Sequence, residues 1–128
     1  MSYSAVVLDH FYNPRNQYVM EDADVKGVAG EPGRGNFMVL YLKLEGERIV
    51  KASFQTHGCA PSIAAGSWLT EQITGNDIAD AAQWSEGKIS EALGGLPAHK
   101  RHCSAFAAAA INSAVRQIGL DRMRPMAH

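Results

Sequence analysis

The 128-residue chain is poor in cysteine, in long apolar runs and in net charge, and each shortage excludes a class of protein. Two cysteines are too few for the disulfide framework of a small secreted domain. We therefore expect reduced thiols, with a single disulfide between Cys59 and Cys103 as the alternative. No apolar stretch reaches the roughly 18 residues that a membrane-spanning helix requires. The net charge of -1 supplies no basic field, so we expect no nucleic-acid partner.

The N-terminal residues also lack a targeting pattern. Residues 1–8 have no basic region before an apolar core, so no signal peptide is predicted and we expect a cytoplasmic protein. The length predicts one domain over residues 1–128, large enough to bury a core without metal or disulfide support. A metal site in such a chain would serve function rather than folding.

The order of predicted elements begins with a helix and then a hairpin. Apolar residues at helical spacing predict a helix over residues 4–12, ended by Asn13-Pro14. Residues 15–35 have the composition of a long loop, with a short strand near residues 25–29. Alternating apolar residues predict strands over 36–44 and 48–56, which Glu45-Gly46-Glu47 joins into an antiparallel hairpin.

Four helical pieces are predicted after the hairpin. They cover residues 62–74, 76–83, 85–93 and 105–118, with Pro61 at the start of the first and Gly75 at its end. Residues 121–128 lack apolar periodicity and are predicted to fray. Strands that come before helices favour an α+β fold, in which helices pack on one face of a small antiparallel sheet of about three strands.

Both cysteines fall at junctions between a loop and a predicted helix. Cys59 follows the second hairpin strand, and Cys103 comes just before the last helix. A histidine lies near each thiol, because His57 precedes Cys59 by two residues and His102 is adjacent to Cys103. If these junctions meet at one end of the sheet, their sulfur and nitrogen atoms would suit zinc or iron.

The surroundings of Cys103 favour its ionised form. The start of a helix has unpaired N–H groups and a positive dipole end, and Lys100 and Arg101 lie just upstream. We therefore expect the Cys103 thiol to ionise more readily than a free cysteine. The alternative is that Cys103 is a small buried apolar residue and His102 a solvated one.

Four motifs resemble those of a known family. They are Asp9-His10-Phe11-Tyr12-Asn13-Pro14-Arg15-Asn16, Gly30-Glu31-Pro32-Gly33-Arg34-Gly35-Asn36, Phe54-Gln55-Thr56-His57-Gly58-Cys59 and Lys100-Arg101-His102-Cys103-Ser104. In this order and spacing, they resemble the iron–sulfur cluster assembly scaffolds of the IscU and NifU N-terminal type over nearly the whole chain.

The resemblance implies a carrier with a three-stranded sheet, not an enzyme in the usual sense. Such a scaffold accepts sulfur as persulfide from a cysteine desulfurase and takes iron from a donor. It builds a 2Fe-2S cluster and passes it to acceptor proteins. The resemblance also implies ligand roles for Cys59, His102 and Cys103, with Cys103 as the sulfur acceptor. Lys100 matches a lysine that the family places beside this site.

Two positions depart from the family pattern. Arg34 stands where the family has its first ligand cysteine, and Asn36 stands where it has an aspartate. A guanidinium cannot bind a metal, and a neutral amide oxygen is a weak ligand. Three matched ligands remain, whereas a 2Fe-2S cluster usually has four.

Several arrangements could complete such a site. Two chains could share one cluster, His57 or His99 could supply a ligand, or an external thiol or partner protein could. Zinc accepts three protein ligands and a water, so zinc bound by Cys59, His102 and Cys103 is the simplest alternative. Residues 96–100 differ at two of five positions from the segment that a dedicated chaperone recognises in relatives, which argues against delivery by that chaperone.

Two further hypotheses belong to other classes. A chain that has lost cluster chemistry could regulate the assembly machinery through its surface alone. An enzyme with Cys103 as nucleophile and His102 as base is disfavoured, because adjacent residues at a helix start rarely present a base to its own neighbour.

Overall fold

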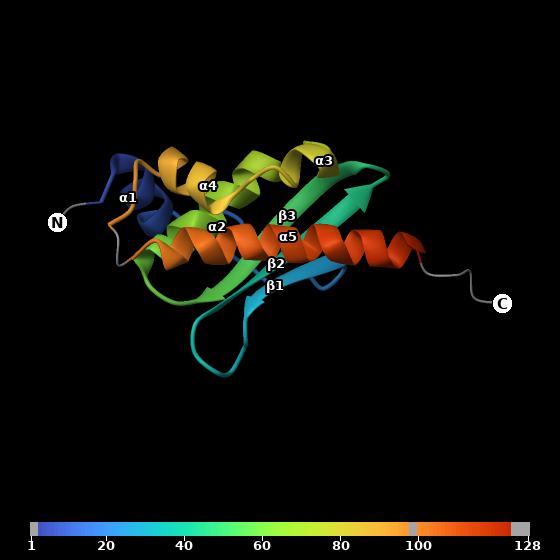
Figure 1. Ribbon diagram of the computed structural model, residues 1–128, viewed down its shortest axis with the longest axis horizontal. Helices are drawn as coiled ribbons and strands as arrows, with labels where there is room; N and C mark the ends of the chain where they lie inside the picture. Colours follow the sequence, from blue (N-terminus) through green and yellow to red (C-terminus); the bar gives the residue numbers. More distant parts are fainter. Residues whose placement is uncertain (1–2, 98–99, 124–128) are drawn as a thin grey trace.

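The computed structural model describes residues 3–97 and 100–123, and in it helices pack against a three-stranded antiparallel sheet (Figure 1). The strands lie side by side in their chain order, and the α+β prediction is confirmed. In chain order the elements are α1 (Ala5–Tyr12), β1 (Val25–Gly30), β2 (Phe37–Glu45), β3 (Arg48–His57), α2 (Ala60–Ile73), α3 (Ile78–Ala81), α4 (Glu86–Ala92) and α5 (His102–Met123).

The alternation in β2 decides which face of the sheet the helices cover. Met38, Leu40 and Leu42 are fully buried in the main core, which they share with residues of α2 and α5. Figure 1 shows α5 running along the sheet, and it packs tightly on β1 at Gly27. A methyl group at Gly27 would collide with the backbone of α5 at Ala110. This contact fixes α5, and with it the position of the helix start.

The opposite face of the sheet is covered in part by the segment that follows α1. Met20 is buried there against Val39 and Tyr41, whose side chains point away from the helices. Asn16 accepts a hydrogen bond at its carbonyl from the Phe54 amide of β3, at 2.9 Å. The helices thus cover one face, as predicted, whereas the predicted loop covers part of the other.

The helix boundaries differ from prediction mainly at α2 and α5. Helix α2 begins at Ala60 with Cys59 as its N-cap residue. Helix α5 begins at His102 rather than residue 105, and it continues past Gly119 to Met123. The predicted fraying is therefore wrong for residues 121–123, and residues 124–128 lie outside the described residues. No helix in the described part of the chain is both long and apolar enough to cross a membrane.

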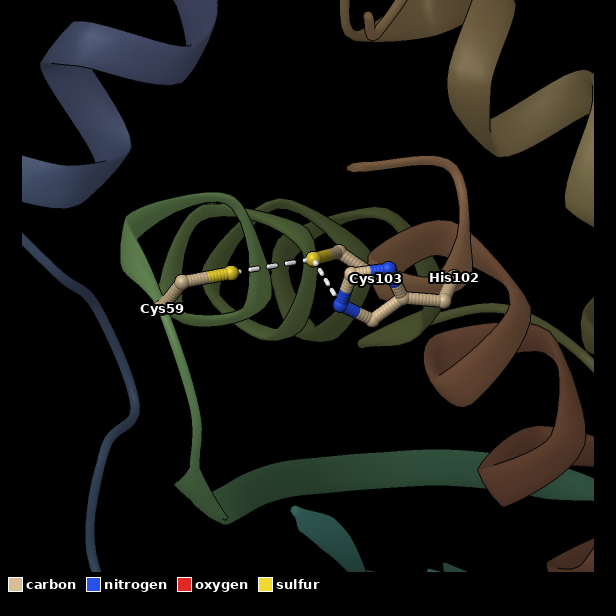
Figure 2. A group of neighbouring side chains, drawn as sticks. All are labelled: Cys59, His102 and Cys103. Atoms are coloured by element: carbon tan, nitrogen blue, oxygen red, sulfur yellow. Dashed lines mark hydrogen bonds between the residues drawn. The ribbon is translucent and has the colours of Figure 1, made fainter. Parts of the chain in front are cut away.

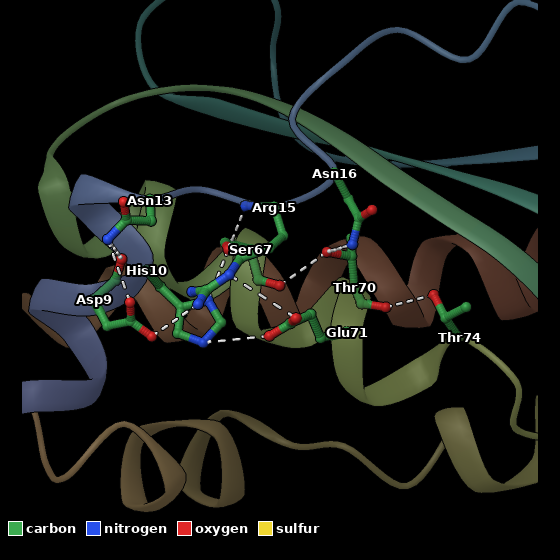
Figure 3. A network of polar contacts seen from close by, with 9 residues as sticks. All are labelled: Asp9, His10, Asn13, Arg15, Asn16, Ser67, Thr70, Glu71 and Thr74. Carbon is green, nitrogen blue, oxygen red and sulfur yellow. Dashed lines mark hydrogen bonds and ion pairs between the residues drawn. The ribbon is translucent and has the colours of Figure 1, made fainter.

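A polar network ties α1 to α2, the helix that carries Cys59 at its start (Figure 3). The ring of buried His10 lies 2.7 Å from the Ser67 hydroxyl at Nδ1, and its Nε2 lies 3.5 Å from Glu71. The Arg15 amide donates to the same Ser67 hydroxyl at 2.9 Å, and the Arg15 guanidinium pairs with Asp9. The motif from Asp9 to Asn16 therefore has a structural role: it clamps α1 to α2.

Protonation would disturb this clamp, because the folded protein favours neutral His10. Burial of the ring lowers the pKa of His10 below its usual value, and the nearby Arg15 charge lowers it further, although Glu71 and Asp9 act in the opposite direction. A histidine whose pKa is lowered by folding stabilises the fold fully above the unfolded pKa of about 6.5. That stability declines as the pH falls below this value.

We expect His10→Gln to reduce the loss of stability between pH 7 and pH 5. The change removes a titrating group whose contribution reaches at most about 1.4 kcal/mol per pH unit. Chemical denaturation at several pH values measures it. The exposed His57, changed to Gln, is the matched control for the replacement of a histidine by glutamine. An unchanged slope in His10→Gln would show that the clamp is not the acid-sensitive element.

Candidate metal centre

Two helix starts bring both sulfur atoms and one imidazole together (Figure 2). Cys59 caps α2, and His102 and Cys103 form the first turn of α5. The two Sγ atoms are 3.2 Å apart, and His102 Nε2 lies 3.5 Å from Cys103 Sγ. All three ligand atoms lie within 4.8 Å of one another. The prediction that the distant junctions converge is confirmed.

Two of the three separations are near those around a single tetrahedral metal ion. With Zn–S near 2.3 Å and Zn–N near 2.0–2.1 Å, sulfur and nitrogen ligands lie about 3.6 Å apart and two sulfurs about 3.8 Å apart. The separation of His102 Nε2 and Cys103 Sγ already has this value. The two sulfurs stand closer by roughly 0.6 Å and would have to separate slightly.

The two thiols differ in burial, and the prediction for Cys103 is wrong on this account. Cys103 is fully buried, and burial raises its pKa to about 11, with the neighbouring Cys59 adding to the rise. The helix start and the charge of Lys100 favour the thiolate, but they do not offset the effect of burial on the pKa of Cys103. Cys103 therefore keeps its proton at neutral pH, contrary to the expectation of easy ionisation.

Cys59 shows the behaviour that was expected of Cys103. Burial acts to raise its pKa, but hydrogen bonds from Cys103 and Ser62, together with the charge of Lys100, leave the pKa below its usual value. The Ser62 hydroxyl lies 3.8 Å from Cys59 Sγ. Ser62 was not singled out in the sequence, where its only signal is its place three residues after the N-cap.

The remaining sequence-predicted residues take different positions. Arg34 is exposed on the glycine loop, where its guanidinium pairs with Glu31 at 3.7 Å. Asn36 lies beside Gly58. A methyl group added at Gly58 would be 4.0 Å from Asn36 Cγ. The ring of His57 stacks on Phe37, with centroids 6.1 Å apart.

Neither His57 nor any other described histidine, cysteine or acid joins the group of Cys59, His102 and Cys103. His99 lies outside the described residues. Lys100 acts on both thiols through its charge. The described chain therefore offers a set of three strong ligands.

The clamp between α1 and α2 also contains a serine, a histidine and an acid, the residue types of a hydrolase triad. Ser67, however, is fully buried, and its hydroxyl already accepts the Arg15 amide. A substrate has no access to that oxygen. Ser67, His10 and Glu71 therefore hold the two helices together and do not form a nucleophilic site.

Comparisons with known proteins agree with this fold. The family model of the NifU-like N terminal domain matches residues 2–122. The chain therefore belongs to the NifU-like N-terminal domain family, to which iron–sulfur cluster assembly scaffolds of the IscU and NifU type are related.

This chain matches different shares of the length of two relatives. Iron-sulfur cluster assembly scaffold protein IscU 1 of Archaeoglobus fulgidus is 46% identical over 113 residues, covering 88% of this chain and 74% of that protein. Nitrogen fixation protein NifU of Azotobacter chroococcum is 39% identical over 124 residues, covering 95% of this chain but 40% of that protein.

A solved structure supports the fold alone. The N-terminal part of a nitrogen-fixing NifU-like protein from Brucella abortus superposes with a TM-score of 0.70 at 15% identity. The superposition covers 91% of this chain and 94% of that one.

We expect iodoacetamide to modify Cys59 well before Cys103 in the native protein at pH 8. Cys59 is partly exposed and has the lower pKa, whereas Cys103 is buried and protonated. Peptide mapping by mass spectrometry over a time course measures the two rates, and the urea-unfolded chain, in which the rates should converge, is the control. Faster modification of native Cys103 would contradict the burial seen here.

Proposed function

We propose that this chain is an iron–sulfur cluster assembly scaffold that accepts sulfur, and binds iron or zinc, through Cys59, His102 and Cys103. The observation that carries the proposal is the placing of two sulfurs and one imidazole nitrogen within 4.8 Å of one another at two helix starts. Sulfur and imidazole ligands suit zinc and iron, and thiols suit persulfide chemistry. The relative from Archaeoglobus fulgidus, an iron-sulfur cluster assembly scaffold protein, points to the same function.

Three ligands leave one position open, which affects what cargo is held. A 2Fe-2S cluster usually takes four protein ligands, so a cluster here needs an external thiol, a second copy of the chain or a partner protein. A single zinc or iron ion needs only water in the fourth position. Arg34 does not oppose a cation strongly, because its exposed guanidinium is paired with Glu31. We infer that the site holds its cargo transiently.

The partners follow from the same chemistry. A cysteine desulfurase would supply sulfur, a donor protein would supply iron, and acceptor proteins would take the cluster. Arg101 is exposed and Lys100 half-buried at the start of α5, so this basic pair could contact an acidic surface on the desulfurase. Thiols in such a role must stay reduced, which is consistent with a cytoplasmic location.

We expect the reduced protein to bind one zinc or ferrous ion per chain. Cys59→Ser and Cys103→Ser should each weaken binding by more than the roughly 10–100-fold that loss of a supporting residue costs, and His102→Ala should also weaken it. Competition with a chromophoric chelator measures the affinity. His57→Ala, which removes a histidine outside the group, should bind like wild type.

Failure of this experiment would favour the alternative function. If neither the wild type nor any variant takes up metal, and none accepts sulfur from a desulfurase supplied with cysteine, the carrier function is contradicted. The chain would then be better explained as a regulatory module that acts within the assembly machinery by its surface.

We also expect Arg34→Cys combined with Asn36→Asp to raise the occupancy of a 2Fe-2S cluster after reconstitution. The double change adds a thiolate at residue 34 of the glycine loop and a carboxylate at residue 36, which lies beside Gly58. Visible absorption and iron and sulfide analysis measure the occupancy. Arg34→Ser with Asn36→Asp is the matched control that lacks the new thiolate. Equal iron content in the double mutant and the wild type would mean that a missing fourth ligand does not limit the site.

A further inference from the structure

The two sulfurs of the candidate site are close enough to react with each other. Cys59 Sγ and Cys103 Sγ lie 3.2 Å apart, within the roughly 3–3.5 Å at which reacting atoms are positioned for attack. They are the only cysteines in the chain, so each has one possible intramolecular partner. Both are free thiols in the structure. A disulfide bond needs about 2.05 Å, so the sulfurs would move together by roughly 1 Å.

We propose that this pair is a built-in reductant that releases sulfide from a bound persulfide. The inference rests on the proposed function, which supplies the persulfide on one of the two cysteines. The inner sulfur of that persulfide is the original Sγ atom, and the other thiol stands 3.2 Å from it. Attack by a thiol sulfur on a sulfur–sulfur bond is the ordinary step of disulfide exchange.

The step balances without any outside electron donor. A bond forms between Cys59 Sγ and Cys103 Sγ, and the bond between the inner and outer sulfur of the persulfide breaks. The outer sulfur gains two electrons and leaves as sulfide, while the pair of cysteine sulfurs is oxidised to a disulfide. The proton of the attacking thiol and the proton of the persulfide leave together as hydrogen sulfide.

The burial of the pair explains why the neighbour, rather than an external thiol, is the attacking group. Cys103 has no exposed surface, so a thiol from solution must displace protein atoms to reach it, and only part of Cys59 is open to solvent. The neighbouring sulfur is already in place. The product disulfide has no free thiolate for a metal, so a dithiol reductant must reopen the pair before the next cycle.

The test uses the full-length, reduced protein without metal and inorganic polysulfide as the sulfur donor, under anaerobic conditions. After rapid removal of the donor, released sulfide is trapped with monobromobimane, and intact mass distinguishes persulfide from disulfide. The wild type should release one sulfide for each disulfide formed. Its rate should be unchanged over a tenfold range of protein concentration, because the step is intramolecular.

Single-cysteine variants provide the controls. In Cys59→Ser and Cys103→Ser, whichever cysteine takes up sulfur should keep a mass heavier by one sulfur atom and release less than a tenth of the wild-type sulfide. His57→Gln keeps both thiols and should behave like wild type. Circular dichroism confirms that each variant is folded.

The outcomes separate this inference from the proposed function. A wild-type persulfide that persists without disulfide, or disulfide that forms without sulfide, would overturn the inference while leaving sulfur acceptance intact. If no form of the protein takes up sulfur while folded, the sulfur-accepting function itself is contradicted, and the inference falls with it.

Discussion

The structure depends on the meeting of two helix starts at one end of the sheet. Cys59 and Cys103 are separated by 44 residues in the sequence, yet their sulfurs lie 3.2 Å apart. Cys103 lies in the main hydrophobic core and Cys59 packs against it, and further contacts hold the helices that carry them. The His10 clamp fixes α2 against α1, and the close packing at Gly27 fixes α5 against β1.

The two thiols in this arrangement are not equivalent. Water reaches Cys59 in part, and hydrogen bonds stabilise its thiolate, whereas Cys103 is fully enclosed and keeps its proton. A pair of this kind releases its protons in two separate steps. His102 is exposed beside it. The site therefore has an open side for exchange of cargo and a fixed side that holds it.

The glycine loop explains why such a site would hold cargo loosely. Arg34 extends into solvent and pairs with Glu31, and Asn36 contributes no charge. A loop that provides no strong ligand leaves the coordination of any metal incomplete from this chain alone. Incomplete coordination favours exchange, because an incoming ligand occupies an open position instead of displacing a bound one.

Much of this structure could be predicted from the sequence, since the strongest signals were local. Alternation in residues 36–44 and 48–56 predicted the hairpin, and Pro61 after Cys59 marked the start of α2. Burial of Cys103 could not be predicted, because it depends on α2 and α5 packing together, and burial outweighed the helix-start effect on its pKa. Gly119 did not end α5, since one exposed glycine costs a helix only about 1 kcal/mol.

The contacts made by the segment after α1 were also missed. Its sequence has no apolar periodicity, yet Met20 and Ala23 pack on the far face of the sheet and the Asn16 carbonyl accepts a hydrogen bond from Phe54. The central claim is that Cys59, Cys103 and His102 bind one metal ion together. X-ray absorption at the zinc edge of the loaded protein tests it most directly. The claim predicts two sulfur neighbours near 2.3 Å and an imidazole nitrogen near 2.0–2.1 Å. A first shell of only nitrogen and oxygen atoms would contradict it.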